Sequence, residues 1–188
     1  MFVFAYGSLM SPDSLHMVLP GIALADCIPA RCTDHQRTFG VAFPNDGSEP
    51  DKAYFDADGT RPEFVLFCDM PEAEGSWLNG VCIPVDTADI QMLEQRELRY
   101  DLVDVTDLVT GYDSSQQFDR VFAFIGSDRF TAPEHIVQGV LHRQYLDTVR
   151  EGVRHWESRT PGFLEDFDKS TTLPDPGRIR SLVRVDFR

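Results

Sequence analysis

The sequence Met1-Phe-Val-Phe-Ala-Tyr6-Gly7-Ser8-Leu9-Met10 decides how the rest of the chain is interpreted. Residues 2–6 are apolar or aromatic and favour extended structure, so we expect a strand here. Gly7-Ser8 interrupts it, and Ser11-Pro12-Asp13 carries helix-start signals for a helix over about 11–18. This order can direct free backbone N–H groups toward an anion, and a glycine lets a ligand approach the main chain. An ordinary strand–turn–helix corner fits the same residues.

Length and charge exclude several classes of protein. The 188 residues predict one domain, 1–188, and the net charge of −14 comes from 31 acidic and 17 basic residues. Nucleic acids and anionic membranes are bound through Lys and Arg, so neither is an expected partner. No apolar run approaches the roughly 20 residues of a membrane span. No basic leader precedes the first strand, so we also expect no signal peptide.

The residues that bind metals or cofactors elsewhere do not form such patterns here. The four cysteines (Cys27, Cys32, Cys68 and Cys82) have neither zinc-site nor C-x-x-C spacing, and three lie in apolar runs. We interpret them as buried reduced thiols, which predicts a cytoplasmic location. The aspartates of residues 46–58 do not match a calcium loop, and His135 and His142 lie seven apart rather than four. We therefore expect no metal and no cofactor.

Apolar patterning and turn residues predict the remaining elements. Strands are expected at 22–32 and 36–43 (a hairpin joined through 33–35), 64–68, 77–85, 99–108, 120–125 and, as an edge strand or docked tail, 180–187. Residues 44–62 are predicted to be a long surface loop, and 71–75 an acidic turn. Helices are expected from Asp86 to about 96, over 163–168, and from a Thr131–Glu134 capping box through Trp156. Gly139 and Gly152 inside that long helix indicate close packing or a bend. The order predicts an α+β fold with a mostly antiparallel sheet, without showing whether the sheet closes.

Glu97 stands out from helical geometry alone. In the helix from Asp86, Ile90 and Leu93 define the apolar face, and Glu97 falls within about 20° of Ile90 on that face. A carboxylate there is either held in a partly desolvated pocket, where burial raises a carboxyl pKa as a general acid–base requires, or lies past the helix end, paired with Arg96 or Arg99. Glu94 is the local competitor for the same role.

Four stretches in this order resemble the γ-glutamylcyclotransferase-like family. They are Tyr6-Gly7-Ser8-Leu9 after the first strand, Arg37-Thr-Phe39-Gly-Val-Ala-Phe43-Pro44-Asn45, Gly80-Val-Cys-Ile-Pro-Val85 and Leu93-Glu-Gln-Arg-Glu97-Leu-Arg-Tyr100. The resemblance covers residues 2 to about 106 and continues more loosely beyond. It implies a small, closed or nearly closed β-barrel (about 1–130) flanked by helices (131–170) with a docked tail to 188, and a site at the barrel mouth.

The resemblance also implies an activity: aminolysis of a γ-glutamyl amide by its own α-amine, releasing 5-oxoproline and a free amine without a cofactor. Glu97 would be the acid–base residue. The N–H groups around Gly7, Ser8 and Leu9 would hold a carboxylate or oxyanion, and Tyr6 and Tyr100 would supply walls and a hydroxyl, although both also fit as core aromatics.

Three functions therefore stay open. The first is this cyclotransferase reaction, and the second is removal of a γ-glutamyl group from a modified metabolite or an isopeptide. The third is a catalytically degenerate protein of the same fold that binds a small ligand or a partner. Residues 44–62 and 71–75 lie where they can cover the pocket or reshape its leaving-group side. The oligomeric state is not indicated.

Overall fold

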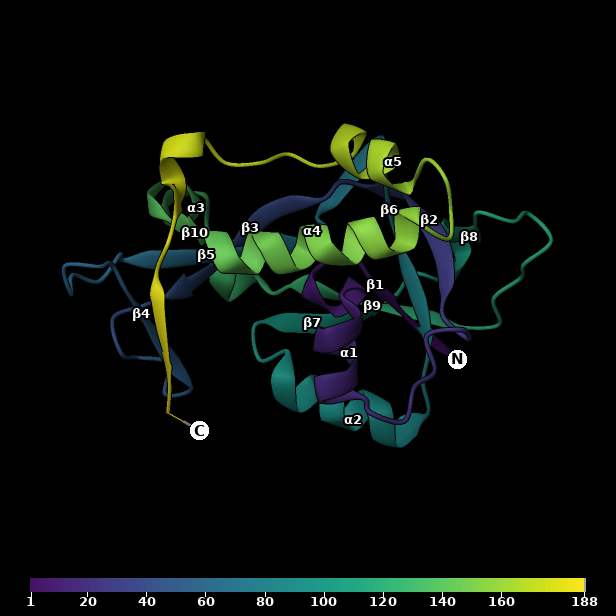
Figure 1. The fold of residues 1–188 in the computed structure, drawn as a ribbon, viewed down its shortest axis with the longest axis horizontal. Coiled ribbons are helices and arrows are strands. Elements are labelled where there is room, and N and C mark those ends of the chain that lie inside the picture. The colour runs from purple at the N-terminus through teal and green to yellow at the C-terminus, as the bar shows by residue number, and fades with distance from the viewer. Residues whose placement is uncertain (188) are drawn as a thin grey trace.

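The computed structural model describes residues 1–187, which form three β-sheets and five α-helices (Figure 1). The strands are β1 (Phe2–Ala5), β2 (Ile28–His35), β3 (Thr38–Pro44), β4 (Lys52–Phe55), β5 (Phe64–Asp69), β6 (Glu72–Pro84), β7 (Tyr100–Asp104), β8 (Val109–Gly111), β9 (Val121–Gly126), β10 (Val140–His142), β11 (Ile179–Arg180) and β12 (Val183–Asp186). The helices are α1 (Pro12–Val18), α2 (Thr87–Arg96), α3 (Pro133–Gln138), α4 (Arg143–Glu157) and α5 (Phe163–Lys169), with 3-10 turns η1 (Ser8–Met10), η2 (Thr106–Leu108), η3 (Asp128–Phe130) and η4 (Pro176–Arg178).

The N-terminal strand and the helix after it are confirmed, and β1 lies inside the largest sheet. Its neighbours are β6, antiparallel, and β9, parallel. Val3 and Phe4 are each 1% exposed, as a strand flanked on both sides requires. Pro12 occupies the start of α1, although Ser11 precedes it without a side-chain capping hydrogen bond. The strand therefore ends at Ala5 deep in the core, and the turn at Gly7 starts from a fixed point.

The mixed α+β class is confirmed, but the closed barrel is wrong. The six-stranded sheet has the order β7-β9-β1-β6-β2-β8, and its end strands do not pair with each other over the described residues. A separate sheet has the order β11-β10-β5-β3, and β12 pairs with β4. The physical reason is that the chain leaves the first sheet after β2 and enters the second at β3. Most of the strand pairs are antiparallel, as expected.

The expected hairpin between the second and third strands is also wrong. β2 pairs with β6 and β8, whereas β3 pairs with β5. β2 begins at Ile28 rather than residue 22, and Asp34 near its end has a positive φ of 55°. The fully buried Arg37 follows in the short crossing between the two sheets. Residues 33–35 thus form a register irregularity near the end of β2 rather than the turn of a hairpin.

Two segments expected as loops contain strand. Within 44–62, Lys52–Phe55 forms β4 and pairs antiparallel with β12, which lies in the stretch near the C-terminus expected as an edge strand or docked tail (Figure 1). The acidic segment 71–75 continues into β6, which starts at Glu72. Gly75 has a positive φ of 74°, so the residue expected to form a turn instead forms an irregularity inside a long strand.

The long C-terminal helix is interrupted at Gly139. α3 ends at Gln138, β10 pairs with β5 and β11, and α4 then starts at Arg143. Gly139 has extended backbone, and a Cβ there would lie 2.4 Å from Leu66 Cδ2, so a larger residue at this bend would force the Leu66 side chain to move. The capping box is wrong too, since Ala132 precedes α3 and no side chain caps it. Helical spacing persists on both sides of the break, which is why periodicity alone predicted one helix.

α4 lies across the sheets and packs on η1, with α1 beside it (Figure 1). Gly152 makes this contact close, because a Cβ there would lie 2.6 Å from main-chain atoms of Met10 and Ser11. Trp156 on the same helix donates from Nε1 to the Met10 carbonyl at 2.9 Å. The N-terminal turn is thus held from one side by β1 and from the other by α4. None of the helices over residues 1–187 is long and apolar enough to span a membrane.

Candidate functional site

A small cavity of about 50 Å³ lies where β1, β5, α2, β7, β9 and α4 meet. Its lining includes all six residues singled out from the sequence: Tyr6, Gly7, Ser8, Leu9, Glu97 and Tyr100. The remaining lining residues are Val3, Phe4, Cys68, Phe124 and Tyr145. The structure therefore brings together residues up to 142 positions apart in the sequence, from Val3 to Tyr145. Their chemical roles remain proposals.

Two hydrogen bonds hold Tyr6 just before the turn at Gly7, one at its side-chain hydroxyl and one at its main-chain carbonyl. The Tyr6 hydroxyl donates to the Phe124 carbonyl at 2.5 Å, and Arg37 Nε donates to the Tyr6 carbonyl at 2.9 Å. Arg37 also donates to the Asn79 side chain and carbonyl and to Thr171 Oγ1. A fully buried guanidinium thus orients the end of β1 without any carboxylate partner among residues 1–187.

The main chain at the turn presents unused donors to the cavity. The N–H groups of Gly7, Ser8 and Leu9 have no hydrogen-bond acceptor within the described part of the chain. A Cβ on Gly7 would lie 3.2 Å from Cys68 Cβ and 3.3 Å from the Tyr145 hydroxyl, so a larger residue would reduce the cavity. This arrangement suits an anionic group brought close to the backbone.

Glu97 reaches the cavity from the end of α2 rather than from its face. The helix starts after Asp86 as expected, and Asp86 and Asp89 form a capping box there. The last helical residue is Arg96, and Glu97 is the C-cap with φ −88° and ψ 49°. The helical-wheel prediction was therefore wrong in its geometry, since Glu97 no longer has helical backbone. Its side chain is 17% exposed and lines the cavity. Glu94 is exposed and does not line it.

Arg96 connects the two sides of the cavity mouth. Its Nη1 lies 2.5 Å from Glu97 Oε1, and its Nη2 donates to Ser8 Oγ at 3.3 Å. The pairing with Arg96 that the sequence left open is therefore present, and it coexists with the position of Glu97 in the cavity wall. Arg96 is one-third exposed, so its side chain can leave this position at small cost.

Three tyrosines form the wall opposite these groups, and their hydroxyls differ in use. Tyr6 and Tyr100 donate to the carbonyls of Phe124 and Cys68, at 2.5 and 2.8 Å. Tyr145, which the sequence analysis missed, accepts from the Cys68 N–H at 3.1 Å, a bond that does not use its own proton, and its hydroxyl lies beside the Cys68 side chain. Burial raises the pKa of all three phenols well above the usual value, which keeps them protonated. Nothing in the local sequence of α4 marks Tyr145, because only tertiary packing places it here.

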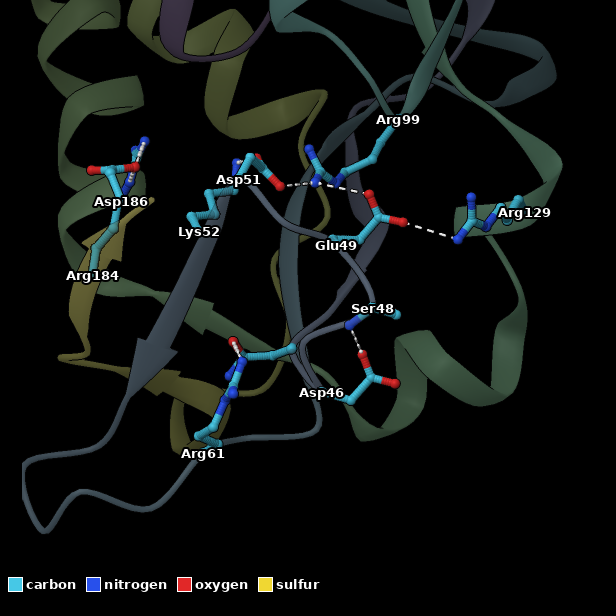
Figure 2. Close-up of polar contacts among 11 residues, drawn as sticks. Asp46, Ser48, Glu49, Asp51, Lys52, Arg61, Arg99, Arg129, Arg184 and Asp186 are labelled. Carbon is cyan, nitrogen blue, oxygen red and sulfur yellow. Dashed lines mark hydrogen bonds and ion pairs between the residues drawn. The ribbon is translucent and has the colours of Figure 1, made fainter. Parts of the chain in front are cut away.

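Arg99, the other partner considered for Glu97, points elsewhere. Figure 2 shows its guanidinium between Asp51 and Glu49, with Arg129 on the far side of Glu49. Arg99 is 4% exposed and stacks on Phe43, 4.7 Å from the ring centre. This ion network fixes the chain before β4 to the turn that follows Glu97. No lining residue of the cavity comes from 44–62 or 71–75, so the expected cover over the pocket is not seen.

No cluster of three or more His, Cys, Asp or Glu side chains able to hold a metal occurs within residues 1–187. The four cysteines are all buried and free. Burial raises the pKa of Cys68, the one that lines the cavity, to about 11, so its sulfur is a thiol at neutral pH.

Comparisons with known proteins identify the fold. No family model and no curated protein matches the sequence. A solved γ-glutamyl cyclotransferase superposes with a TM-score of 0.62 at 14% identity, over 95% of this chain and 92% of that one. An uncharacterized human protein gives 0.61 at 17% identity, over 93% and 89%. A yeast γ-glutamyl cyclotransferase specific to glutathione gives 0.54 at 13%, over 91% and 96%. The chain has the γ-glutamyl cyclotransferase-like fold, as the sequence resemblance implied.

Proposed function

We propose that this chain catalyses intramolecular aminolysis of a γ-glutamyl amide, releasing 5-oxoproline and a free amine. The observation that carries the proposal is the meeting of the Glu97 carboxylate, the free N–H groups of residues 7–9 and the Tyr145 hydroxyl around one cavity. The reaction needs a base, a means of stabilising an oxyanion and a site that curls the substrate. The likeness in fold to γ-glutamyl cyclotransferases supports the same reaction class.

Glu97 would carry the proton through both halves of the reaction. Its carboxylate removes a proton from the substrate α-ammonium, and the freed amine attacks the γ-carbonyl carbon. The C–N bond closes a five-membered ring, and the carbonyl becomes a tetrahedral oxyanion. Protonated Glu97 then delivers its proton to the leaving nitrogen, and the oxyanion re-forms the carbonyl as the amide C–N bond breaks. The ring nitrogen gives up its second proton to the departing amine, so 5-oxoproline and an ammonium are released. No cofactor enters this balance.

The remaining groups would hold the substrate. The N–H groups of Gly7, Ser8 and Leu9 could bind either the α-carboxylate or the oxyanion. The Tyr145 hydroxyl would then donate to whichever of these two groups the N–H groups do not bind. Curling the chain so that its amine meets its own carbonyl replaces an encounter between two molecules, which accounts for a large share of such rate enhancements. A cavity of about 50 Å³ is smaller than a γ-glutamyl group, so Arg96 must swing from the mouth as substrate enters.

The leaving amine is a separate question. Removal of a γ-glutamyl group from a modified metabolite or an isopeptide follows the same steps with a different amine. The second candidate class is a protein that binds a γ-glutamyl compound or 5-oxoproline without turnover. The short Arg96–Glu97 ion pair and the small cavity favour this alternative, because both restrict access to the carboxylate.

The test is 5-oxoproline release from a panel of γ-glutamyl amino acids, γ-glutamyl amines and glutathione. Glu97→Gln is compared with Glu94→Gln, an exposed glutamate on the same helix that does not line the cavity. We expect at least about a hundredfold loss in the first variant and none in the second, with unchanged thermal unfolding. Release that survives Glu97→Gln moves the proton transfer elsewhere. No release from any compound, with thermal stabilisation by 5-oxoproline, favours the binding protein.

A further inference from the structure

A second, larger hollow lies beside β3 and is unrelated to the cavity at Glu97. It has a volume of about 660 Å³ and is bounded by the edge strand β3, by β5, by the residues around α3 and by the segment 172–178. Phe39, Leu66, Ile136 and Leu173 form its apolar walls. This volume is in the range of small-molecule sites. Consecutive residues of β5 separate the two hollows, since Cys68 lines the cavity and Asp69 lines this groove.

Asp69 is a buried carboxylate with one oxygen in use and one free. The residue is 3% exposed, and its Oδ1 accepts from the N–H groups of Met70 and Gly126, each at 2.9 Å. Its Oδ2 has no hydrogen-bond donor over residues 1–187. A Cβ on Gly40 would lie 3.2 Å from that oxygen and 3.0 Å from Thr38 Oγ1. The main chain at Gly40 thus passes close to two oxygen acceptors, and a side chain there would crowd both of them.

No arginine or lysine forms an ion pair with this carboxylate within residues 1–187, and the basic side chain whose charge acts on it is His35. Arg178, the basic residue that lines the groove, donates to the carbonyls of Ile136 and Gly139 instead. Asp175, the other charged lining residue, is acidic and exposed. Burial raises the pKa of Asp69, and it outweighs the two backbone hydrogen bonds and the charge of His35, which act in the opposite direction. A buried carboxylate is normally paired or fully hydrogen-bonded, and this one lacks a partner at one oxygen.

We propose that the groove binds a small primary ammonium compound with an apolar substituent. The ammonium group donates to Asp69 Oδ2 and Thr38 Oγ1 from the groove that both residues line, and the substituent lies against the apolar walls. An ammonium group supplies a hydrogen-bond donor and a positive charge, and Asp69 Oδ2 lacks both. A hydrogen bond between two charged groups is also stronger than one between neutral groups. The proposal does not depend on the reaction assigned to Glu97.

The test is calorimetric titration of the full chain with 2-phenylethylammonium, with 2-phenylethanol as the neutral probe of the same shape. We expect saturable binding of the amine and at least tenfold weaker binding of the alcohol. Asp69→Asn should weaken amine binding by about tenfold to a hundredfold, the range for a hydrogen bond to a charged group. Asp175→Asn removes an equal charge at the exposed rim and should change the affinity less than threefold.

Gly40→Ala provides a second variant in case Asp69→Asn unfolds. Its methyl group would crowd both oxygen acceptors and should abolish amine binding, while circular dichroism confirms the fold. Each of three results would overturn the proposal: no saturable binding of the amine to the wild type, equal binding of amine and alcohol, or undiminished binding by a folded Asp69→Asn or Gly40→Ala protein.

Discussion

Arg37 Nε donates to the main-chain carbonyl of Tyr6 at 2.9 Å, so a residue in the crossing between two sheets fixes the last peptide before Gly7. The guanidinium is completely buried and stacks over Phe167 at 4.6 Å. Burial lowers its pKa to about 10, which still leaves it charged at neutral pH. The same side chain reaches Asn79 on β6 and Thr171 after α5. Arg37 therefore couples the turn at the cavity to three other parts of the fold.

Replacement of Arg37 should be among the most destabilising single changes. Arg37→Met leaves the Tyr6 and Asn79 carbonyls without their donor, and each buried unsatisfied group costs about 1–3 kcal/mol. We expect a loss of about 3 kcal/mol or more in the free energy of unfolding, measured in urea by tryptophan fluorescence. Arg129→Met, whose guanidinium is 70% exposed, should lose less than about 1 kcal/mol. Equal effects of the two changes would refute the structural role of Arg37.

Gly152→Ala tests the contact between α4 and the N-terminal turn. The added Cβ would lie 2.6 Å from main-chain atoms of Met10 and Ser11, which cannot move as a side chain can. Although alanine favours helix, we expect a net destabilisation of about 2 kcal/mol or more, because the helix must shift away from η1. Gly177→Ala adds a methyl group with no heavy atom within 4 Å and should be nearly neutral. A neutral Gly152→Ala would show that α4 is not held this closely.

The sequence predicted correctly the elements whose ends are set by residues next to them in the chain. The strand before Gly7, the start of α1 and the start of α2 after Asp86 depend on neighbouring residues and appear as expected. The hairpin failed because β2 finds its partner in β6, some forty residues later. The long helix failed because Gly139 must pass beside Leu66, a contact that periodicity does not record. The barrel, which came from resemblance, failed because the chain changes sheets at Arg37.

The residues of the candidate site also divide into those that neighbouring sequence indicates and those that only tertiary packing brings to the cavity. The motif around Gly7 and the pair Glu97 and Tyr100 were identified because they lie in two short stretches of sequence. Tyr145 and Phe124 were missed because they occupy ordinary positions in a helix and a strand, and only packing places them at the cavity. Glu97 lines the cavity, but the helical-wheel argument for its position does not hold, since the helix ends one residue before it.

Lys52 should make stability depend on pH in an unusual direction. Its Nζ lies 4.9 and 5.4 Å from the ring centres of Phe67 and Phe43 and 3.5 Å from Asp51 Oδ2. Burial, followed by the charge of Arg99, lowers its pKa to about 8. Between that value and about 10.4, the pKa of an unfolded lysine, the unfolded chain holds the additional proton. The contribution of Lys52 to the free energy of unfolding therefore rises with pH in this window.

The measurement is the difference in free energy of unfolding between wild type and Lys52→Met at pH 7.5 and 9.5. The wild type should gain about 1–2 kcal/mol relative to the variant over this interval. Buried cysteines, whose pKa values are raised, act in the opposite direction but equally in both proteins, so the difference cancels them. Lys169→Met, at an exposed position, should show no such gain. A difference that is independent of pH would contradict the burial of Lys52.

Tyr145→Phe separates a role in turnover from a role in folding. Because the Tyr145 hydroxyl accepts from the Cys68 N–H without using its own proton, its loss should lower the kcat for 5-oxoproline release by about tenfold to a hundredfold. It should cost only about 1 kcal/mol of stability. Tyr100→Phe removes a hydroxyl already bonded to the Cys68 carbonyl, so it should reduce stability by a similar amount and leave kcat within about threefold. If both variants lose the same activity, the tyrosines shape the wall and neither donates to the reacting oxygen.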